Sequence, residues 1–441
     1  MAESPLSIAI VGGGIIGLMT ALGLTRRGLR VTVYERAAQW PDYGAGFAFT
    51  AVARESMRRL DPDVLAALLR VGARDPSPTF QYWDGAGPGD KAAAADPAAA
   101  LIFEVPEHHL GFVACLRSRF LLEMAGLLAA RAGTEEDLVR FNKQLVGLRD
   151  RPGEKVVLRF GDGTTAEADV VLGCDGVHST MRRELLGHDH PAAQAHYAHK
   201  TVYRALVPLP GAMAALGAAK ASRSGNHLGP GAHIVSYPVQ SHNLYNLYLF
   251  VHDDGDWPHD APGSAVPSSR DEALRALAGW GPHVRELAAL LPPRVSKHAI
   301  FDMLAHPAPT YARGRACIAG DAAHASCPFH GSGTTMGVED GLVLAELLAD
   351  VAGPGDAQAR AVRVEAALRA YSEVRMARSQ WVVRSSREMG DMFEFRHAAV
   401  GRDGDRLRRE FEERARVVWD FDVDGMVARA KEVFGRNLQR Q

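Results

Sequence analysis

Three consecutive glycines interrupt the first apolar segment of the chain, and they constrain the fold more than any other feature of the sequence. Residues 8–11 are predicted to form a short buried strand, and residues 15–27 have the apolar spacing of a helix that ends at Gly28. Residues 30–34 are predicted to form a second strand. This order is typical of a βαβ unit, so the chain is expected to open with a doubly wound α/β domain.

The glycine turn also has the spacing of a dinucleotide-binding site. Gly12, Gly14 and Gly17 match the pattern GxGxxG between a strand and a helix. Glycine permits the tight turn and lets a pyrophosphate approach the positive N-terminal end of the helix. Glu35 follows the second strand about twenty residues further on, where a carboxylate can accept hydrogen bonds from a ribose. These features favour dinucleotide binding over a purely structural turn, but both NAD and FAD use the motif.

Size and composition fit a globular protein of two or three domains. Of the 441 residues 47% are apolar and 23% are charged, and the net charge of −2 argues against a nucleic-acid partner. The apolar run at residues 8–24 is broken by glycines, which argues against a signal peptide or a membrane anchor, so no membrane partner is expected. Four scattered cysteines indicate a reducing compartment, and we expect a cytoplasmic protein. Four histidines between residues 188 and 199 lack metal-ligand spacing, so no metal site is expected.

Two further segments bear on the choice between the two cofactors. The first is a buried strand that ends in Asp175-Gly176, within the sequence DVVLGCDGVHSTMR. The second is a strand that delivers Asp321, within GRACIAGDAAH. It is followed by PFHGSGT, which contains Gly331, Gly333 and Thr334 and leads into a helix.

The order of these motifs resembles that of the flavoprotein aromatic hydroxylases, and the resemblance spans nearly the whole chain. It implies an FAD-dependent monooxygenase with FAD as cofactor, and NADPH or NADH and O₂ as co-substrates. By this resemblance Asp321 would bind the ribityl or pyrophosphate part of FAD, Arg117 would help to hold the cofactor, and Ala48 would contact it through its backbone. Asp175 would serve both FAD and NAD(P)H.

The turn at residues 331–333, followed by Thr334, completes the expected cofactor site. By the same resemblance, Gly331 and Gly333 would present backbone N–H groups to the flavin N1–C2=O edge, at a helix N-terminus that favours negative charge. Many relatives carry Gln between these glycines. Ser332 departs from that pattern, so details of plain phenol hydroxylases transfer poorly to this chain.

The expected architecture is a Rossmann-like FAD-binding domain interleaved with an antiparallel-sheet substrate domain, plus C-terminal helices. Alternating strands and frequent turns within residues 191–295 predict the substrate domain, to which residues 81–114 add a loop and a strand. The three parts of the FAD-binding domain are expected at 1–80, 115–190 and 296–360, and the helical region at 361–441. The protein is expected to be a monomer or a homodimer.

Two side chains of the substrate domain indicate a small phenolic or anionic substrate. Arg204 shares a strand face with Val202 and Leu206, and Tyr237 shares one with Val235. A guanidinium and a phenol on an apolar side need a polar partner, either a ligand or a structural acid. The stretches around both residues resemble the fungal polyketide branch of the family, which includes the tropolone, sorbicillinoid and azaphilone monooxygenases. In that branch such a pair binds the substrate phenolate.

The resemblance also implies a reaction. NAD(P)H would reduce FAD, O₂ would add to flavin C4a, and an electron-rich ring carbon would attack the resulting hydroperoxide. Arg204 and Tyr237 would stabilise the phenolate. Attack at an alkyl-bearing carbon leaves no proton to lose, so the resemblance implies hydroxylative dearomatisation of a phenolic polyketide. His330 lies close to the expected flavin position, where a catalytic or substrate-positioning role and a structural role are both open.

Three other functions stay open on the sequence. The chain could hydroxylate the ring of a salicylate-like acid, with Arg204 binding the carboxylate. It could be a flavin dehydrogenase or oxidase on the same fold. It could also bind a nucleotide without redox chemistry, although Asp321 and the adjacent glycine-rich turn argue against this.

Overall fold

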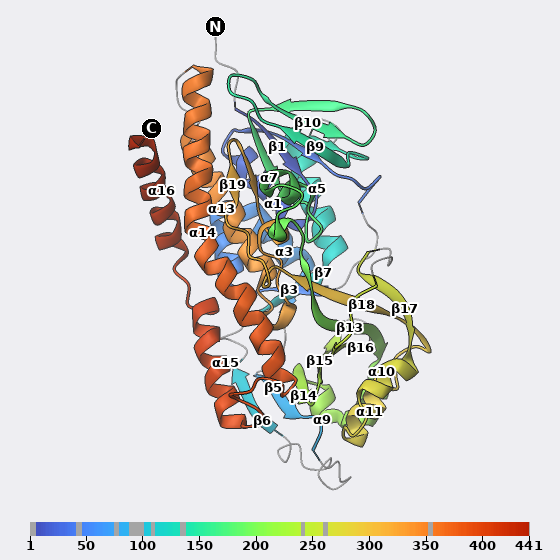
Figure 1. The fold of residues 1–441 in the computed structure, drawn as a ribbon. Coiled ribbons are helices and arrows are strands. Elements are labelled where there is room, and N and C mark those ends of the chain that lie inside the picture. The colour runs from blue at the N-terminus through green and yellow to red at the C-terminus, as the bar shows by residue number, and fades with distance from the viewer. Residues whose placement is uncertain are drawn as a thin grey trace.

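The computed structural model describes residues 6–40, 46–74, 79–87, 101–106, 111–132, 138–239, 243–258, 263–351 and 356–440. These residues form two large sheets, one in each half of the molecule, with helices packed around them (Figure 1). Most of the loop expected between 81 and 114 lies outside the described residues, at 88–100.

A six-stranded sheet forms the core of the first domain, in the order β19, β20, β12, β1, β2 and β8. These strands span Ala312–Arg313, Ala316–Ile318, Val170–Gly173, Ser7–Val11, Arg30–Tyr34 and Val139–Arg140, in that order. β1 pairs in parallel with β2 and β12, and β12 pairs in parallel with β20. Every residue of β1 and β12 is buried, as expected for parallel strands that are covered on both faces. The doubly wound α/β domain is therefore confirmed.

Helices enclose this sheet. α1 (Ile15–Arg26) follows β1 as the glycine pattern predicts, and α5 (Arg117–Ala132) and α13 (Gly333–Val351) pack against it. The remaining elements of this domain are β3 (Gly46–Phe49), α2 (Ala51–Leu60), α3 (Pro62–Val71), β4 (Ala73–Arg74), β7 (Val113–Leu116), β9 (Leu145–Arg149), β10 (Val156–Phe160), β11 (Thr165–Ala168), α7 (Thr180–Leu186), η1 (Pro191–Ala193) and α12 (Asp321–His324). β3, β7 and β4 form a small separate sheet at the boundary with the second domain.

An eight-stranded sheet forms the second domain, in the order β17, β18, β13, β16, β15, β14, β5 and β6. These strands span Ala265–Ser269, Arg294–Asp302, His196–Pro208, Leu244–His252, Ala232–Val239, Gly225–Gly229, Thr79–Asp84 and Leu101–Pro106, in that order. All neighbours are antiparallel except β14 and β5. The sheet takes β5 and β6 from the N-terminal part of the chain, so the two domains are interleaved. β18 spans the boundary expected between residues 295 and 296.

The two faces of this sheet have different cover. Tyr203, Ile234 and Leu247 belong to an apolar cluster on one face. Helices on that side are α8 (Leu209–Leu216), α9 (Ala218–Ala221), α10 (Arg270–Ala276) and α11 (Pro282–Ala288). We call the opposite face of β13, β16 and β15 the open face; it carries Val202, Arg204, Leu206, Asn246, Tyr248, Phe250, His233, Val235 and Tyr237. Alternation along each strand separates the two sets.

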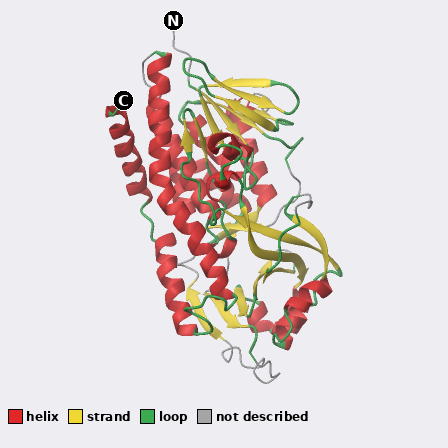
Figure 2. Cartoon of the chain, viewed as in Figure 1, coloured by secondary structure: helices red, strands yellow, loops and turns green. Residues whose placement is uncertain are grey.

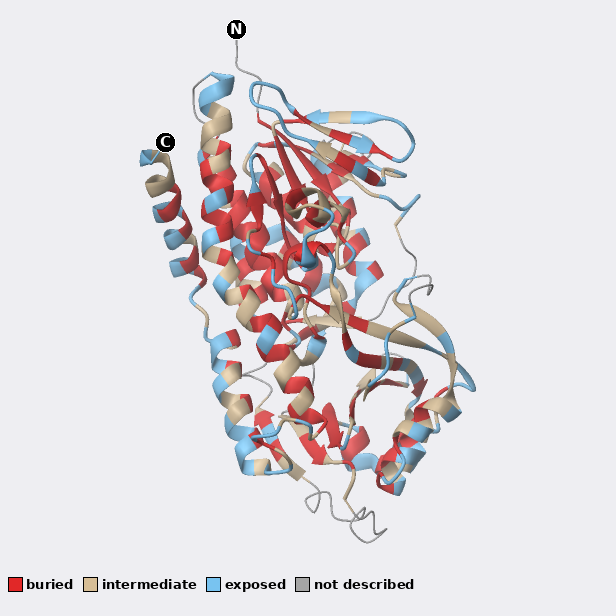
Figure 3. Cartoon of the chain, viewed as in Figure 1, coloured by how far each residue is buried: buried red, intermediate tan, exposed pale blue. Residues whose placement is uncertain are grey.

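A helix of 37 residues, α14 (Ala357–Phe393), runs along both domains (Figure 2). It packs against α13 in the first domain and against the short helix η3 (Pro328–His330) at the domain boundary. α15 (Gly404–Trp419) and α16 (Val423–Gln439) follow, and their outer sides are exposed (Figure 3). In the described part of the chain, no helix has both the length and the apolar character that crossing a membrane requires.

Candidate functional site

The glycine turn after β1 has no space for side chains at Gly12 and Gly17, where backbone atoms are the obstacle. Gly12 has a φ of +102°, and a Cβ there would lie 2.4 Å from the carbonyl oxygen of Cys174. A Cβ on Gly17 would lie 2.0 Å from the carbonyl oxygen of Gly12. By contrast, a Cβ on Gly14 would come no closer than 3.8 Å to a neighbouring side chain, the guanidinium of Arg117. The turn is therefore packed on its inner side and open at Gly14, where α1 begins.

Positive and negative groups flank this opening. Arg117, the first residue of α5, is exposed beside the positive N-terminal end of α1. The carboxylate of Glu35 lies on the other side of the turn, where it accepts hydrogen bonds from the backbone N–H groups of Gly13 (2.7 Å) and Ala37 (2.8 Å). Each carboxylate oxygen keeps further acceptor capacity. A pyrophosphate beside Gly14 and Arg117 and a ribose near Glu35 would match these groups.

Asp321 reaches the same region from the other side of α1. Gly320 has a φ of +60°, and a Cβ on it would lie 3.4 Å from the side chain of Ile16. A Cβ on Gly337 of α13 would lie 2.6 Å from the same side chain. Asp321 follows Gly320 at the start of α12 and is exposed. The first turn of α1 is thus the point where the glycine turn, Asp321 and the beginning of α13 meet.

A buried carboxylate holds the turn at Asp321 in place. Asp340 accepts a hydrogen bond from the backbone N–H of Gly320 (2.9 Å) and contacts His324 Nε2 (2.6 Å) and Arg375 Nε (2.8 Å). Burial raises the pKa of Asp340, but the charges of His324 and Arg375 outweigh it and bring the pKa to about 2. The sequence patterns did not indicate a role for Asp340 or Arg375. Adjacent acids inside an apolar helix, Glu339 and Asp340, were the available signal of a buried ion pair.

A buried arginine joins the Asp175 motif to the turn at Asp321. Arg182 donates hydrogen bonds to the carbonyl oxygens of Val177 (2.6 Å) and Ala322 (3.0 Å). Burial lowers the pKa of this guanidinium to about 10. Arg182 is the last residue of the Asp175 motif, and its structural role was not predicted from the sequence. The structure shows that it fixes the backbone next to Asp321.

Asp175 itself binds the start of α7. One carboxylate oxygen accepts hydrogen bonds from the backbone N–H groups of Thr180 (2.7 Å) and Met181 (3.0 Å), and the other accepts one from the Ser179 hydroxyl (2.5 Å). These contacts favour a role in shaping the turn. The direct contact of Asp175 with FAD or NAD(P)H stays a prediction.

The turn at residues 331–333 lies close to the strand that carries Ala48. Thr335 in the first turn of α13 and Thr50 directly after β3 share a hydrogen bond between their hydroxyls, 3.1 Å. Gly331 is exposed with a φ of +62°, and Gly333 and Thr334 are half-buried. The first N–H groups of α13 have no partner inside the helix. Ala48, Gly331, Gly333 and Thr334 are thereby gathered around the contact between β3 and the start of α13.

His330 points away from this edge and into the contact with the C-terminal helices. Its Nε2 lies 2.8 Å from the Ser385 hydroxyl, and its ring stacks on Trp381 at 6.3 Å between centroids. Its carbonyl oxygen accepts a hydrogen bond from the Ser332 hydroxyl (2.9 Å). Burial, with the charge of Arg414, lowers the pKa of His330 to about 3. This geometry favours the structural role, in which His330 supports the turn at residues 331–333; a catalytic role stays a prediction.

The open face presents Arg204 and Tyr237 on the same side of the sheet. Tyr248 on β16 lies directly opposite Arg204, and its hydroxyl donates to the carbonyl oxygen of Gly46 in β3 (3.4 Å). A Cβ on Gly46 would lie 3.6 Å from the hydroxyl of Tyr237. Burial raises the pKa of Tyr248, against a hydrogen bond with Tyr237 and the charge of Arg204. These three residues therefore form one cluster against β3, the strand of Ala48.

Arg204 has a histidine as its neighbour. It lies 3.4 Å from His298 Nδ1, and burial together with the charge of Arg204 lowers the pKa of His298. Among the described residues, Arg204 forms no ion pair with an acid. The sequence left open that a structural acid neutralises Arg204. No such acid is found in the described part of the chain.

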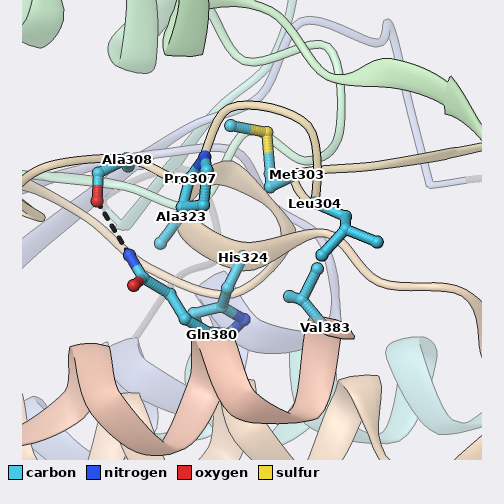
Figure 4. A pocket seen from close by; sticks show the side chains of 8 residues that line it. All are labelled: Met303, Leu304, Pro307, Ala308, Ala323, His324, Gln380 and Val383. Atoms are coloured by element: carbon cyan, nitrogen blue, oxygen red, sulfur yellow. Dashed lines mark hydrogen bonds between the residues drawn. The ribbon is translucent and has the colours of Figure 1, made fainter. Parts of the chain in front are cut away.

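A small hollow borders the other side of the turn at Asp321 (Figure 4). His324 and Ala323 of α12 line it together with Gln380 and Val383 of α14. Gln380 donates a hydrogen bond to the carbonyl oxygen of Ala308 (2.8 Å) across its edge. Its volume is about 10 Å³, which is the size of a single water molecule, so it is too small for substrate or cofactor.

Two family models match the chain. One described as "FAD binding domain" matches residues 121–386, and one described as "FAD dependent oxidoreductase" matches residues 7–77. A FAD-dependent monooxygenase of Aspergillus terreus is 54% identical over 439 residues, covering 99% of both chains. A salicylate hydroxylase of Sarocladium schorii is 40% identical and covers 98% of this chain and 92% of its own length.

Solved structures show the same fold. A salicylate hydroxylase in complex with its substrate superposes with a TM-score of 0.82 at 29% identity, over 97% of this chain and 98% of that one. The open glycine turn, the exposed Asp321 and the start of α13 fit FAD, which the family binds. The chain therefore belongs to the family of FAD-dependent monooxygenases of the salicylate hydroxylase type.

Proposed function

We propose that this enzyme hydroxylates an electron-rich phenolic substrate of polyketide type, using NADPH or NADH and O₂. The observation that carries the proposal is the cluster of Arg204, Tyr237 and Tyr248 on the open face, next to β3. β3 contains Ala48, which is expected to contact FAD. A phenol held by this cluster would thus lie close to the expected position of the flavin.

Arg204 supplies the charge that such a substrate needs. A guanidinium beside a neutral histidine keeps its full positive charge for a ligand, and a phenolate is a suitable acceptor. Tyr237, whose hydroxyl is hydrogen-bonded to Tyr248, would have to turn its O–H to the substrate to donate a second hydrogen bond to the same oxygen. Both contacts stabilise the phenolate, which makes the ring carbon a better nucleophile and fixes which carbon is attacked.

Bound FAD, once reduced by NAD(P)H, would activate dioxygen and supply the transferred oxygen atom. The chain would hold the pyrophosphate between Gly14, Arg117 and the N-terminus of α1, and the flavin between β3 and the start of α13. Asp340 and Arg182 would keep Asp321 in position.

The outcome of the reaction depends on the substituent at the attacked carbon. An alkyl group there leaves no proton to lose after oxygen transfer, so the ring stays non-aromatic. We propose this dearomatising outcome, which rests on the resemblance of the stretches around Arg204 and Tyr237 to the fungal polyketide branch. A second candidate is plain ring hydroxylation of a salicylate-like acid, which the similarity to salicylate hydroxylases favours.

One reaction separates these candidates. The purified holoenzyme receives NADPH, isotopically labelled O₂ and an alkylated resorcinol aldehyde, and product mass and flavin absorbance are followed together. We expect one labelled oxygen in a non-aromatic product. A rearomatised catechol would support ring hydroxylation instead, and oxidation of the substrate without labelled oxygen would support a dehydrogenase or oxidase.

A further inference from the structure

The open face contains a buried amide that the proposed function does not use. Asn246 lies on β16 and is only 7% exposed, yet its Nδ2 atom has no hydrogen-bond partner among the described residues. A side-chain interaction of hydrogen-bond type with Tyr248 helps to lower the pKa of that tyrosine against the larger effect of burial, but Nδ2 reaches no partner with the distance and angles of a hydrogen bond. Leaving a buried N–H unpaired is costly, and such groups in native proteins call for an explanation.

The position of Asn246 supplies that explanation. β16 runs between β13, which carries Arg204, and β15, which carries Tyr237. Asn246 lies directly opposite Tyr237 on one side and Leu206 on the other. Neighbouring strands are about 4.8 Å apart, so a ligand that contacts both Arg204 and Tyr237 must cover β16 between them. On the open face that part of β16 consists of Asn246 and Tyr248.

The surface around Asn246 is accessible from the same side. Leu206 is 54% exposed, and Arg204, two residues before it on the same face, is exposed as well. A ligand that covered Leu206 would bury apolar surface there and would bring its own polar atoms to Asn246. The Asn246 amide thus lies between Leu206 and Tyr237, where it could bind a single polar atom of a ligand.

We propose that Asn246 is a specificity-determining residue whose side-chain N–H donates a hydrogen bond to a carbonyl oxygen of the substrate. An acyl phenol, in which the aromatic ring carries a phenolic oxygen and a neighbouring aldehyde or ketone, has both of the oxygen atoms that this arrangement needs. The phenolate binds Arg204 and Tyr237, and the carbonyl binds Asn246. This inference rests on the proposed function, because it needs a phenolate held by Arg204 and Tyr237.

The chain offers a matched control for this position. Asn226 on β14 is 2% exposed, and its Oδ1 atom also has no hydrogen-bond partner in the described part of the chain. It lies opposite Val235, on the far side of β15 from Asn246. The same substitution at Asn226 removes an equally buried amide outside the strip between Arg204 and Tyr237.

The test measures binding rather than turnover. FAD-loaded wild type and the variants N246L, N246D, N226L and R204A are titrated without NAD(P)H, and the change in flavin absorbance gives Kd. The two probes are an alkylated resorcinol aldehyde and the same resorcinol without its formyl group. Comparing the ratio of the two Kd values between variants removes the intrinsic difference in acidity of the probes. N246D keeps the shape of the side chain and serves where N246L does not fold.

We expect N246L to weaken binding of the aldehyde by about tenfold and to leave the probe without the formyl group unchanged, whereas N246D, which adds a negative charge, should weaken binding of both phenolates and of the aldehyde by the larger factor. N226L should leave both Kd values unchanged. The role of Asn246 would be overturned if N246L changed the Kd values of both probes equally or changed neither. It would also be overturned if N226L reduced the preference for the aldehyde probe to the same extent. If wild type binds neither probe, or R204A binds both as well as wild type does, the proposed function itself fails.

Discussion

The cofactor side and the substrate side of this molecule use polar groups in opposite ways. Around the turn at Asp321, buried charges are paired within the chain: Asp340 binds His324 and Arg375, and Arg182 binds backbone carbonyls. On the open face, Arg204 has a neutral histidine as its neighbour, and the amide of Asn246 keeps an unpaired N–H. In the first region the buried charges hold the backbone of the chain itself, whereas on the open face Arg204 has no acidic partner among the described residues and Nδ2 of Asn246 has no hydrogen-bond partner there.

This difference matches the two tasks. A cofactor that stays bound is served by backbone atoms in a fixed geometry, and buried ion pairs hold that geometry. A substrate that enters and leaves needs side chains whose hydrogen-bonding capacity becomes satisfied when it binds. Substitutions on the cofactor side should therefore reduce stability and FAD content, whereas substitutions on the open face should change binding and turnover in a folded enzyme.

The largest effect is expected at Asp340. The variant D340N keeps the shape of the side chain but leaves Arg375 and His324 without this carboxylate in a buried site, which should cost roughly 3 to 5 kcal/mol of stability and release FAD. Thermal unfolding and the ratio of flavin to protein absorbance measure both. As a control, E346Q alters a partly exposed pair with Arg27 and Lys431, where a change below about 1 kcal/mol is expected. Full FAD content in D340N would show that the paired network is dispensable.

The next effect tests the open face. R204A should lower kcat/KM by at least about 100-fold, because the charge that stabilises the phenolate is lost, while FAD content and Tm stay close to wild type. The control is R294A, which removes an exposed arginine at the start of β18. We expect its kinetics to be those of wild type. R204K should recover part of the activity, since it restores charge without the planar guanidinium. Normal kinetics in R204A would remove Arg204 from the site.

The fold of the cofactor side could be predicted well from the sequence because its signals are local. Backbone geometry leaves no room for a side chain at Gly12 or Gly17, and Gly14 is open where a ligand would approach, so the spacing of the three alone indicates the turn and the helix that follows. The parallel pairing of β1 with β2 followed from the βαβ pattern. The buried ion pair that holds this site in place was not predicted. Asp340 and Arg375 come into contact only because α13 and α14 pack together, which no local pattern shows.

The open face was predicted in part for a similar reason. Alternation along one strand placed Arg204 with Val202 and Leu206, and it placed Tyr237 with Val235, as the structure has them. Alternation does not give the order of strands, so the position of β16 between β13 and β15 was not foreseen. Tyr248 and Asn246 were therefore missed, and so was His298, which reaches Arg204 from β18.

A smaller effect on stability is expected from His330, at low pH. Its pKa is about 3 in the folded protein, against about 6.5 in an unfolded chain. Above pH 6.5 neither state is protonated. As the pH falls below 6.5, the unfolded chain takes up a proton that the buried ring cannot, so stability is lost by about 2 kcal/mol at pH 5.

The variant H330N should lack this loss, and its urea midpoint should fall less between pH 7 and pH 5 than that of wild type. Burial also lowers the pKa values of His227 and His233. These residues reduce stability at low pH equally in wild type and H330N, so they do not change the difference between the two proteins. H188N, at an exposed position beside Glu184, should behave as wild type. Equal pH dependence in H330N and wild type would mean that folding does not lower the pKa of His330. Loss of turnover in H330N at pH 7 with intact FAD binding would instead favour the catalytic role.

The smallest effect is expected from removing a tyrosine hydroxyl, and it should differ between the two faces of the substrate-domain sheet. Y237F removes one hydroxyl that can bind the substrate oxygen, and we expect kcat/KM to fall by about tenfold with little change in stability, because the ring remains. Tyr203 is the matched control: it lies on the helix-covered face, where its hydroxyl binds Glu272 at 3.1 Å. Y203F should keep wild-type kinetics, and any change should appear in Tm. If both variants lost the same activity, the hydroxyl of Tyr237 would act through the sheet rather than on the substrate, and the contrast between the two sides of the molecule would not hold at this position.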